Sequence, residues 1–181
     1  MFKIEPVDLI LCVNDRTDWF SSFKRWGSGR YEHTAMYLGT FHDIPMLYES
    51  DGRGVVIQNV AHQTGRPVVI MRPKLSKVQK NKVIKTAFDI ASDDKSYYDY
   101  FGLVKSAIPR ILKEKFSFLP IPSQYVRDAM MICSEATAEP FWRNGFEVLP
   151  QDIIPLPTDY FTSPILEYAH EGKLLEDIVA K

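Results

Sequence analysis

Short apolar runs separated by turn-forming residues fill the part of the chain between residues 33 and 72. The runs are rich in Val, Ile, Tyr and Met, and Gly39, Asp51-Gly52 and Gly65 stand among them. A parallel pair of strands would need a crossover connection of a dozen or more residues, which these spacings do not offer. The pattern therefore predicts an antiparallel meander. Its expected strands are His33 to Leu38, Pro45 to Glu49, Gly54 to Asn59 and Val68 to Arg72.

A strand and a helix are expected on either side of this meander. The continuous apolar run from Val7 to Val13 is typical of a buried central strand, and it makes Cys12 a packed, inert thiol. Ser76 followed by Gln79 forms a capping box, so we expect a helix to begin after Ser76.

The last third of the chain mixes a helical pattern with many prolines. A second helix is expected to start at Cys133 and to stop at Asn144-Gly145. Residues 146–149 then suggest a short strand, residues 149–163 an extended wrap, and residues 165–180 one or two terminal helices. The sequence thus predicts an α+β fold in a single domain, 1–181, whose C-terminal part, 150–181, is an extended wrap and helices.

Composition removes several classes of protein. Hydrophobic residues make up 45% and charged residues 25% of the chain, which is ordinary for a globular protein, and the net charge of −1 offers no bulk field for nucleic acid. Two cysteines are too few for a disulfide framework, and their spacing is not that of a metal site. No apolar run approaches the roughly 20 residues of a membrane span, and no signal peptide is evident. We therefore expect a cytoplasmic protein without cofactor or metal, although release by lysis or injection would fit the same sequence.

Cys133 is the residue that points most directly to chemistry. It lies where the apolar run 130–132 gives way to a helical pattern. A helix N-terminus carries unpaired N–H groups and about half a positive charge, which lowers the pKa of a thiol placed there. The position predicts a nucleophilic cysteine.

A cysteine nucleophile needs a base and a group that orients the base. Of the four histidines, His33 is favoured because it opens a strand, and His62 in a polar loop is the next candidate. Glu49 ends the neighbouring strand, so that the two side chains would share one face if the strands pair. The alternative for Glu49 is an ordinary strand-end carboxylate facing water.

The order of these segments resembles that of the circularly permuted papain-like hydrolases of the NlpC group. The segments are 7–11, 32–39, 48–50, 54–57 and 132–135, and the resemblance spans about residues 5 to 165. In that superfamily the histidine precedes the cysteine, which lies late in the chain on a helix. The resemblance implies a permuted papain-like fold: an antiparallel, barrel-like sheet with the nucleophile helix packed against it.

The resemblance also assigns roles. Cys133 matches the nucleophile, His33 the general base and Glu49 the group that orients the imidazole. The aromatic segment 97–101 resembles a stretch that lines the cleft, so Tyr98 and Tyr100 are expected to bind substrate, together with Tyr37 in the His33 strand. The implied mechanism is acyl transfer through a thioester.

Three functions remain open at this point. The first is hydrolysis of an amide in a peptide or a cell-wall-like substrate. The second is a thiol-dependent lipid acyltransferase or esterase, resembling lecithin:retinol acyltransferase, whose acyl pocket would be lined by residues 116–122 and by the aromatic side chains of residues 19–26. The third is a non-catalytic binding module on the same fold.

Overall fold

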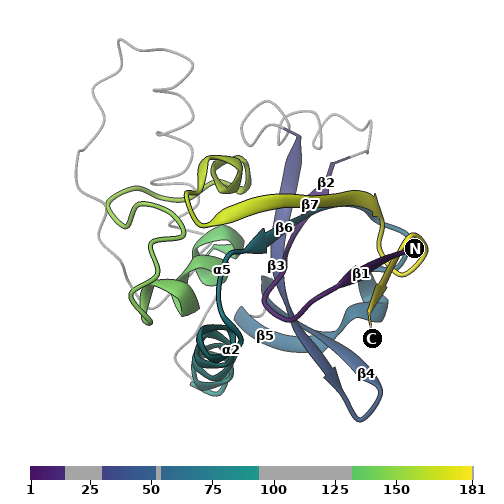
Figure 1. Cartoon of the computed structure of the whole chain (residues 1–181), viewed down its shortest axis with the longest axis horizontal. Coiled ribbons are helices and arrows are strands. Elements are labelled where there is room, and N and C mark those ends of the chain that lie inside the picture. Colours follow the sequence, from purple (N-terminus) through teal and green to yellow (C-terminus); the bar gives the residue numbers. More distant parts are fainter. Residues whose placement is uncertain (15–29, 52–53, 94–131, 181) are drawn as a thin grey trace.

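An antiparallel sheet forms the centre of the protein (Figure 1). In the computed structural model, which describes residues 1–14, 30–51, 54–93 and 132–180, this sheet has six strands in the order β5-β4-β3-β2-β6-β7. Their bounds are β2 Leu9–Val13, β3 Tyr31–Phe41, β4 Ile44–Asp51, β5 Gly54–Asn59, β6 Pro67–Pro73 and β7 Leu166–Lys173. A separate parallel pair joins β1 (Phe2–Ile4) to β8 (Ile178–Ala180). The described residues therefore form a mixed fold of the α+β class, as predicted.

The meander predicted from the turn residues is confirmed for β3, β4 and β5, each of which pairs with the next. The following strand, β6, pairs with β2 instead of β5. A 3₁₀ helix, η1 (Val60–Gln63), and a turn at Gly65 with a φ of 76° connect β5 to β6. The insertion of β2 between β3 and β6 makes it a central strand, and all of its residues are buried.

Two α-helices pack on one face of the sheet (Figure 1). The helix α2 (Lys77–Ala91) begins with the predicted capping box of Ser76 and Gln79. The helix α5 (Cys133–Trp142) begins at the predicted cysteine and continues two residues beyond Pro140. Within the described ranges, no helix has both the length and the apolar character that crossing a membrane requires.

The side chains of β2 divide the core into two layers because successive residues of a strand point to opposite faces. Leu9 and Leu11 belong to the large cluster under α2 and α5. Ile10 and Cys12 belong to a second cluster on the other face, together with Ile4 and Ile178 of the β1–β8 pair. Cys12 is 1% exposed, and burial raises the pKa of its thiol. It is therefore the packed thiol that the apolar run predicted.

Two elements predicted for the C-terminal part of the sequence are wrong. Residues 146–149 form no strand, since Val148 and Leu149 are buried under α5 and the carbonyl of Leu149 accepts a hydrogen bond from Trp142 Nε1 at 2.7 Å. Residues 165–180 form β7 and β8 instead of helices. The strand β7 lies at the edge of the sheet, where its backbone pairs with β6 although many of its side chains are exposed. The wrap between them contains a further 3₁₀ helix, η3 (Pro157–Thr162).

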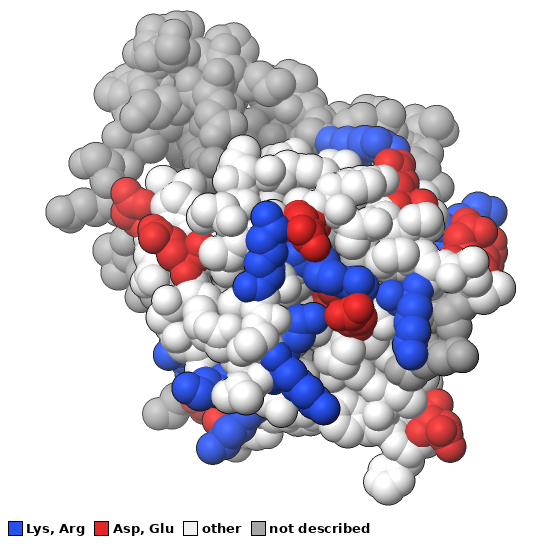
Figure 2. Space-filling view, in the orientation of Figure 1, with Lys and Arg blue, Asp and Glu red and all other residues white. Residues whose placement is uncertain are grey.

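Basic and acidic side chains lie beside one another on the face shown in Figure 2. One group of ion pairs links the N-terminal segment to β6 and α2. Asp8 is 0% exposed and accepts two hydrogen bonds from Arg72, at 2.9 and 2.7 Å. Arg72 also pairs with Glu5 at 2.9 Å, and Glu5 in turn pairs with Lys80 at 3.1 Å. A buried carboxylate needs such partners because an unpaired charge in the interior is costly.

Candidate active site

The register of the sheet brings His33 and Glu49 onto one face. Ala35 of β3 lies opposite Glu49 of β4, and His33 is two residues before Ala35, so His33 and Glu49 are diagonal neighbours. His33 Nε2 and Glu49 Oε2 are 2.5 Å apart. The side chain of His33 is 17% exposed and that of Glu49 is 1% exposed. The expectation that the two side chains share a face is therefore confirmed.

Cys133 reaches the same place from α5. Two threonines join the start of the helix to β3: Thr137 Oγ1 donates to the carbonyl of Cys133 at 2.7 Å and lies 3.2 Å from Thr34 Oγ1. The Cys133 side chain is half-buried and lies close enough to His33 for the imidazole to lower the pKa of the thiol. Because Glu49 engages Nε2 of the ring, Nδ1 is the nitrogen left for the thiol.

The contacts shift both groups toward an ion pair. Burial raises the pKa of the Cys133 thiol, but the hydrogen bond and charge of His33, with further hydrogen bonds from Thr34, lower it below its ordinary value. Burial lowers the pKa of His33, but the hydrogen bonds with Cys133 and Glu49 raise it well above the ordinary value. A thiolate beside an imidazolium is the nucleophilic form of cysteine.

Glu49 is a buried carboxylate surrounded by donors. Its Oε1 accepts a hydrogen bond from Gln58 Nε2 at 2.8 Å and lies 2.8 Å from His62 Nε2. Its Oε2 faces Gln63 Nε2 at 3.4 Å in addition to His33. Burial raises the pKa of Glu49, but the hydrogen bond and charge of His33, together with Gln58 and His62, bring it below the ordinary value. The carboxylate is therefore held ionised.

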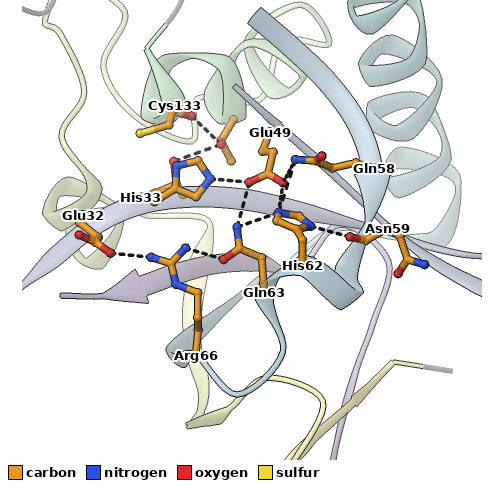
Figure 3. A network of polar contacts seen from close by, with 11 residues as sticks. Glu32, His33, Glu49, Gln58, Asn59, His62, Gln63, Arg66 and Cys133 are labelled. Atoms are coloured by element: carbon orange, nitrogen blue, oxygen red, sulfur yellow. Dashed lines mark hydrogen bonds and ion pairs between the residues drawn. The ribbon is translucent and has the colours of Figure 1, made fainter. Parts of the chain in front are cut away.

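A second layer of contacts supports these donors (Figure 3). His62 Nδ1 donates to the backbone carbonyl of Asn59 at 2.6 Å. Gln63 Oε1 accepts from Arg66 Nη1 at 2.5 Å, and Arg66 Nη2 donates to Glu32 Oε1 at 2.6 Å. The hydrogen-bond network thus runs from the His33 imidazole through the Glu49 carboxylate to η1 and the turn that follows it.

The start of α5 also provides donors for an oxyanion. The N-cap residue is Ile132, which makes no side-chain cap hydrogen bond. Residues usual at this position, such as Ser or Asp, would accept hydrogen bonds from the N–H groups of the first turn. The apolar N-cap offers no side-chain acceptor to the N–H groups of the two residues after Cys133, and the N–H of Cys133, the first residue of the helix, lies beside its own sulfur. Backbone N–H groups placed in this way stabilise the negative oxygen of a tetrahedral intermediate.

The predicted site residues fall into three groups. Cys133, His33 and Glu49 meet at one place, although they come from distant parts of the sequence. Tyr98 and Tyr100 lie outside the described residues, as do the aromatic segments 19–26 and 116–122. Tyr37 is 0% exposed in the second core cluster, with its hydroxyl 2.9 Å from Thr40 Oγ1. This conformation gives Tyr37 no surface for a substrate, because the strand turns its side chain into the interior.

Sequence reasoning missed Thr34 and the glutamines around Glu49. Gln58 could have been found from the alternation of β5, since it pairs with Leu47 and therefore lies diagonally to Glu49 on the same face. Gln63 carries no such signal, because it lies in a short 3₁₀ helix. His62, considered above as a possible base, lies at the oxygen of Glu49 that His33 does not contact.

A scan against protein-family models finds no match, and a search of curated proteins finds none. Among solved structures, the chain is similar to one described as the metalloprotein yiiX from Escherichia coli O157:H7, DUF1105, with a TM-score of 0.59 and 17% sequence identity. The match covers 94% of this chain and 98% of that one. At this identity the likeness shows a shared fold. Among the described residues here, no group of three or more His, Cys, Asp or Glu side chains is placed to hold a metal ion.

Proposed function

We propose that the protein is a cysteine-dependent hydrolase with a permuted papain-like fold of the NlpC group, in which Cys133, His33 and Glu49 act together. The observation that carries the proposal is their convergence at the start of α5: a half-buried thiol and an imidazole close enough to shift each other's pKa, the imidazole being held at 2.5 Å by a buried carboxylate. The order of the residues in the chain, with the histidine before the cysteine, also fits that group.

The proposed reaction has two steps. The proton of the Cys133 thiol passes to His33, and the thiolate attacks the carbonyl carbon of an amide while the N–H of Cys133 donates to the oxyanion. Protonated His33 then gives its proton to the leaving nitrogen, the C–N bond breaks, and an acyl thioester remains. In the second step His33 takes a proton from water, the hydroxide displaces the sulfur, and the thiol and a carboxylic acid are formed.

An amide is the preferred substrate class because of what its leaving group requires. An amine leaves only after its nitrogen has been protonated, and an imidazolium beside the thiolate supplies that proton. Glu49 would keep the ring in the orientation that presents Nδ1 to the sulfur and later to the leaving group.

Mass spectrometry of adducts on Cys133 tests this proposal. The full chain is incubated with panels of peptides, lipid esters and acyl thioesters, and Cys133→Ala is the control. We expect a peptide-derived acyl adduct on Cys133 together with release of the amine product. Adducts from lipid esters alone would replace the amidase with an acyltransferase or esterase.

The reactivity of the thiol separates an enzyme from a binding module. An activated Cys133 reacts with iodoacetamide at pH 6 faster than a free cysteine does, because more of it is thiolate. Peptide mapping distinguishes it from Cys12, which is buried. A Cys133 no more reactive than free cysteine would reject the hydrolase.

A further inference from the structure

The carboxylate of Glu49 lies between two imidazole rings, one at each oxygen (Figure 3). His33 of β3 is 2.5 Å from Oε2, and His62 of η1 is 2.8 Å from Oε1. The proposed reaction uses only the first ring. The side chain of His62 is 37% exposed, so that solvent reaches it more readily than it reaches Glu49.

The contacts of His62 depend on its protonation. Its Nδ1 donates to the carbonyl of Asn59, so a neutral ring has a lone pair on Nε2. That lone pair accepts a hydrogen bond from Gln63 Nε2 at 2.9 Å, an amide whose orientation is fixed by the Arg66 hydrogen bond to its oxygen. The same lone pair would repel Oε1 of Glu49 at 2.8 Å. A protonated ring instead donates from Nε2 to Oε1, and the two nitrogens of His62 and Gln63 then oppose each other as donors.

We propose that His62 is a positioning residue for Glu49: its protonated ring holds the carboxylate in line with His33, and its neutral ring transfers its hydrogen bond to Gln63. This inference rests on the proposed function, because it concerns the same thiol. It adds a contact between His62 and Glu49 that depends on the protonation of His62 and that influences the Cys133 thiol through His33.

The charges around His62 determine the direction of the effect. Glu49 faces His62 from β4, and His33 of β3 lies on the other side of Glu49. Gln63 connects His62 to Arg66 through hydrogen bonds. The positive charge of Arg66 is partly balanced by its ion pair with Glu32 of β3. The positive charge of His62 favours an ionised Glu49. Glu49 in turn favours protonated His33, and protonated His33 favours the Cys133 thiolate. Loss of His62 should therefore move formation of the thiolate to higher pH.

The experiment measures the rate of Cys133 alkylation by iodoacetamide between pH 4 and pH 9 in the full chain, read by peptide mapping. In His62→Ala, we expect the acid limb of the profile to move to higher pH, with about a threefold lower rate on that limb, the size typical of a charge pair with one exposed partner. In His62→Gln, a neutral side chain that can still donate, part of the shift should be recovered. His42→Asn, at an exposed turn where φ is 48°, is the matched control and should leave the profile unchanged.

The outcomes separate this inference from the proposed function. If the wild-type thiol is activated and His62→Ala gives the same pH profile, the positioning role of His62 is overturned and the proposed hydrolase stands. A wild-type thiol that reacts like free cysteine would remove both. Circular dichroism of each variant at each pH establishes that it is folded. If His62→Ala is not folded, the comparison of His62→Gln with wild type decides: a shifted acid limb supports the role and an unchanged one overturns it.

Discussion

Replacement of Glu49 by glutamine gives the sharpest test of the site, because it keeps the shape of the side chain and removes only the charge and one acceptor. The side-chain nitrogens of Gln58, Gln63 and His33 all face this carboxylate as hydrogen-bond donors. A glutamine has one oxygen and one NH₂ group, so one side of it must place a donor against a donor. If NH₂ faces His33, the ring is driven to the tautomer with its proton on Nδ1, which cannot accept the thiol proton.

The size of the effect follows from the lost contact. A hydrogen bond to a charged group contributes about 1.5–3 kcal/mol, and about 1.4 kcal/mol corresponds to one pKa unit. Without the carboxylate, the pKa of His33 should therefore fall, and the thiolate–imidazolium pair should become about 10- to 100-fold rarer at a fixed pH.

The assay is the rate of Cys133 alkylation by iodoacetamide at pH 6, with peptide mapping and circular dichroism on the same sample. Glu171→Gln is the matched control, since Glu171 pairs with Arg30 on the surface and its side chain is 41% exposed. Such pairs contribute about 0–1 kcal/mol, and the control should alkylate at the wild-type rate. A folded Glu49→Gln variant that alkylates within about twofold of wild type, far short of the expected loss of about 10- to 100-fold, would refute the orienting role of Glu49.

Three other predictions concern stability. Asp8→Ala should lower the free energy of unfolding in urea by about 2–4 kcal/mol, because Arg72 loses a buried partner while retaining its ion pair with Glu5. A loss below about 1 kcal/mol, the contribution of a surface ion pair, would contradict this prediction. Ser76→Ala should cost about 1 kcal/mol by removing the cap of α2, measured in the same way, whereas no change would show that the capping box is not formed in solution. The pKa of Glu49 is lowered in the folded state, so its stabilising contribution is present above the pKa of the unfolded chain and is lost as the pH falls through the pKa of the folded protein. The difference in the free energy of unfolding between wild type and Glu49→Gln should therefore narrow from pH 6 toward pH 3. A constant difference would count against this prediction.

Local signals predicted most of the sheet and the two α-helices of the described ranges, α2 and α5. The turn residues delimited β3, β4 and β5, and the Ser76 capping box placed the start of α2 correctly. These features depend on neighbours in the sequence, so they can be read without the fold. The pairing of β6 with β2 could not be read in this way, because it depends on which open edge the chain reaches after η1.

The C-terminal strands were missed for a related reason. An edge strand such as β7 is stabilised mainly by its backbone pairing with β6, and its exposed side chains carry no strict alternation. The shared face of His33 and Glu49 could be predicted from the expected pairing of their strands, and the place of Cys133 from the helical pattern that begins there. The two strands continue beyond the predicted ends, to Tyr31 and Asp51. Gln63 and Arg66 could not be predicted, since polar residues in a short loop look alike until the fold places Gln63 beside the buried Glu49 and Arg66 beside Gln63.

The hydroxyl contacts that fasten the start of α5 to β3 have a consequence for how the chain acquires reactivity. His33 and Glu49 belong to a hairpin made early in synthesis, whereas Cys133 is added about a hundred residues later, a separation of the kind that slows assembly. Until α5 has docked on β3, the Cys133 thiol lacks the neighbouring imidazole that lowers its pKa. If Cys133 is the proposed nucleophile, its activation therefore requires the completed tertiary structure.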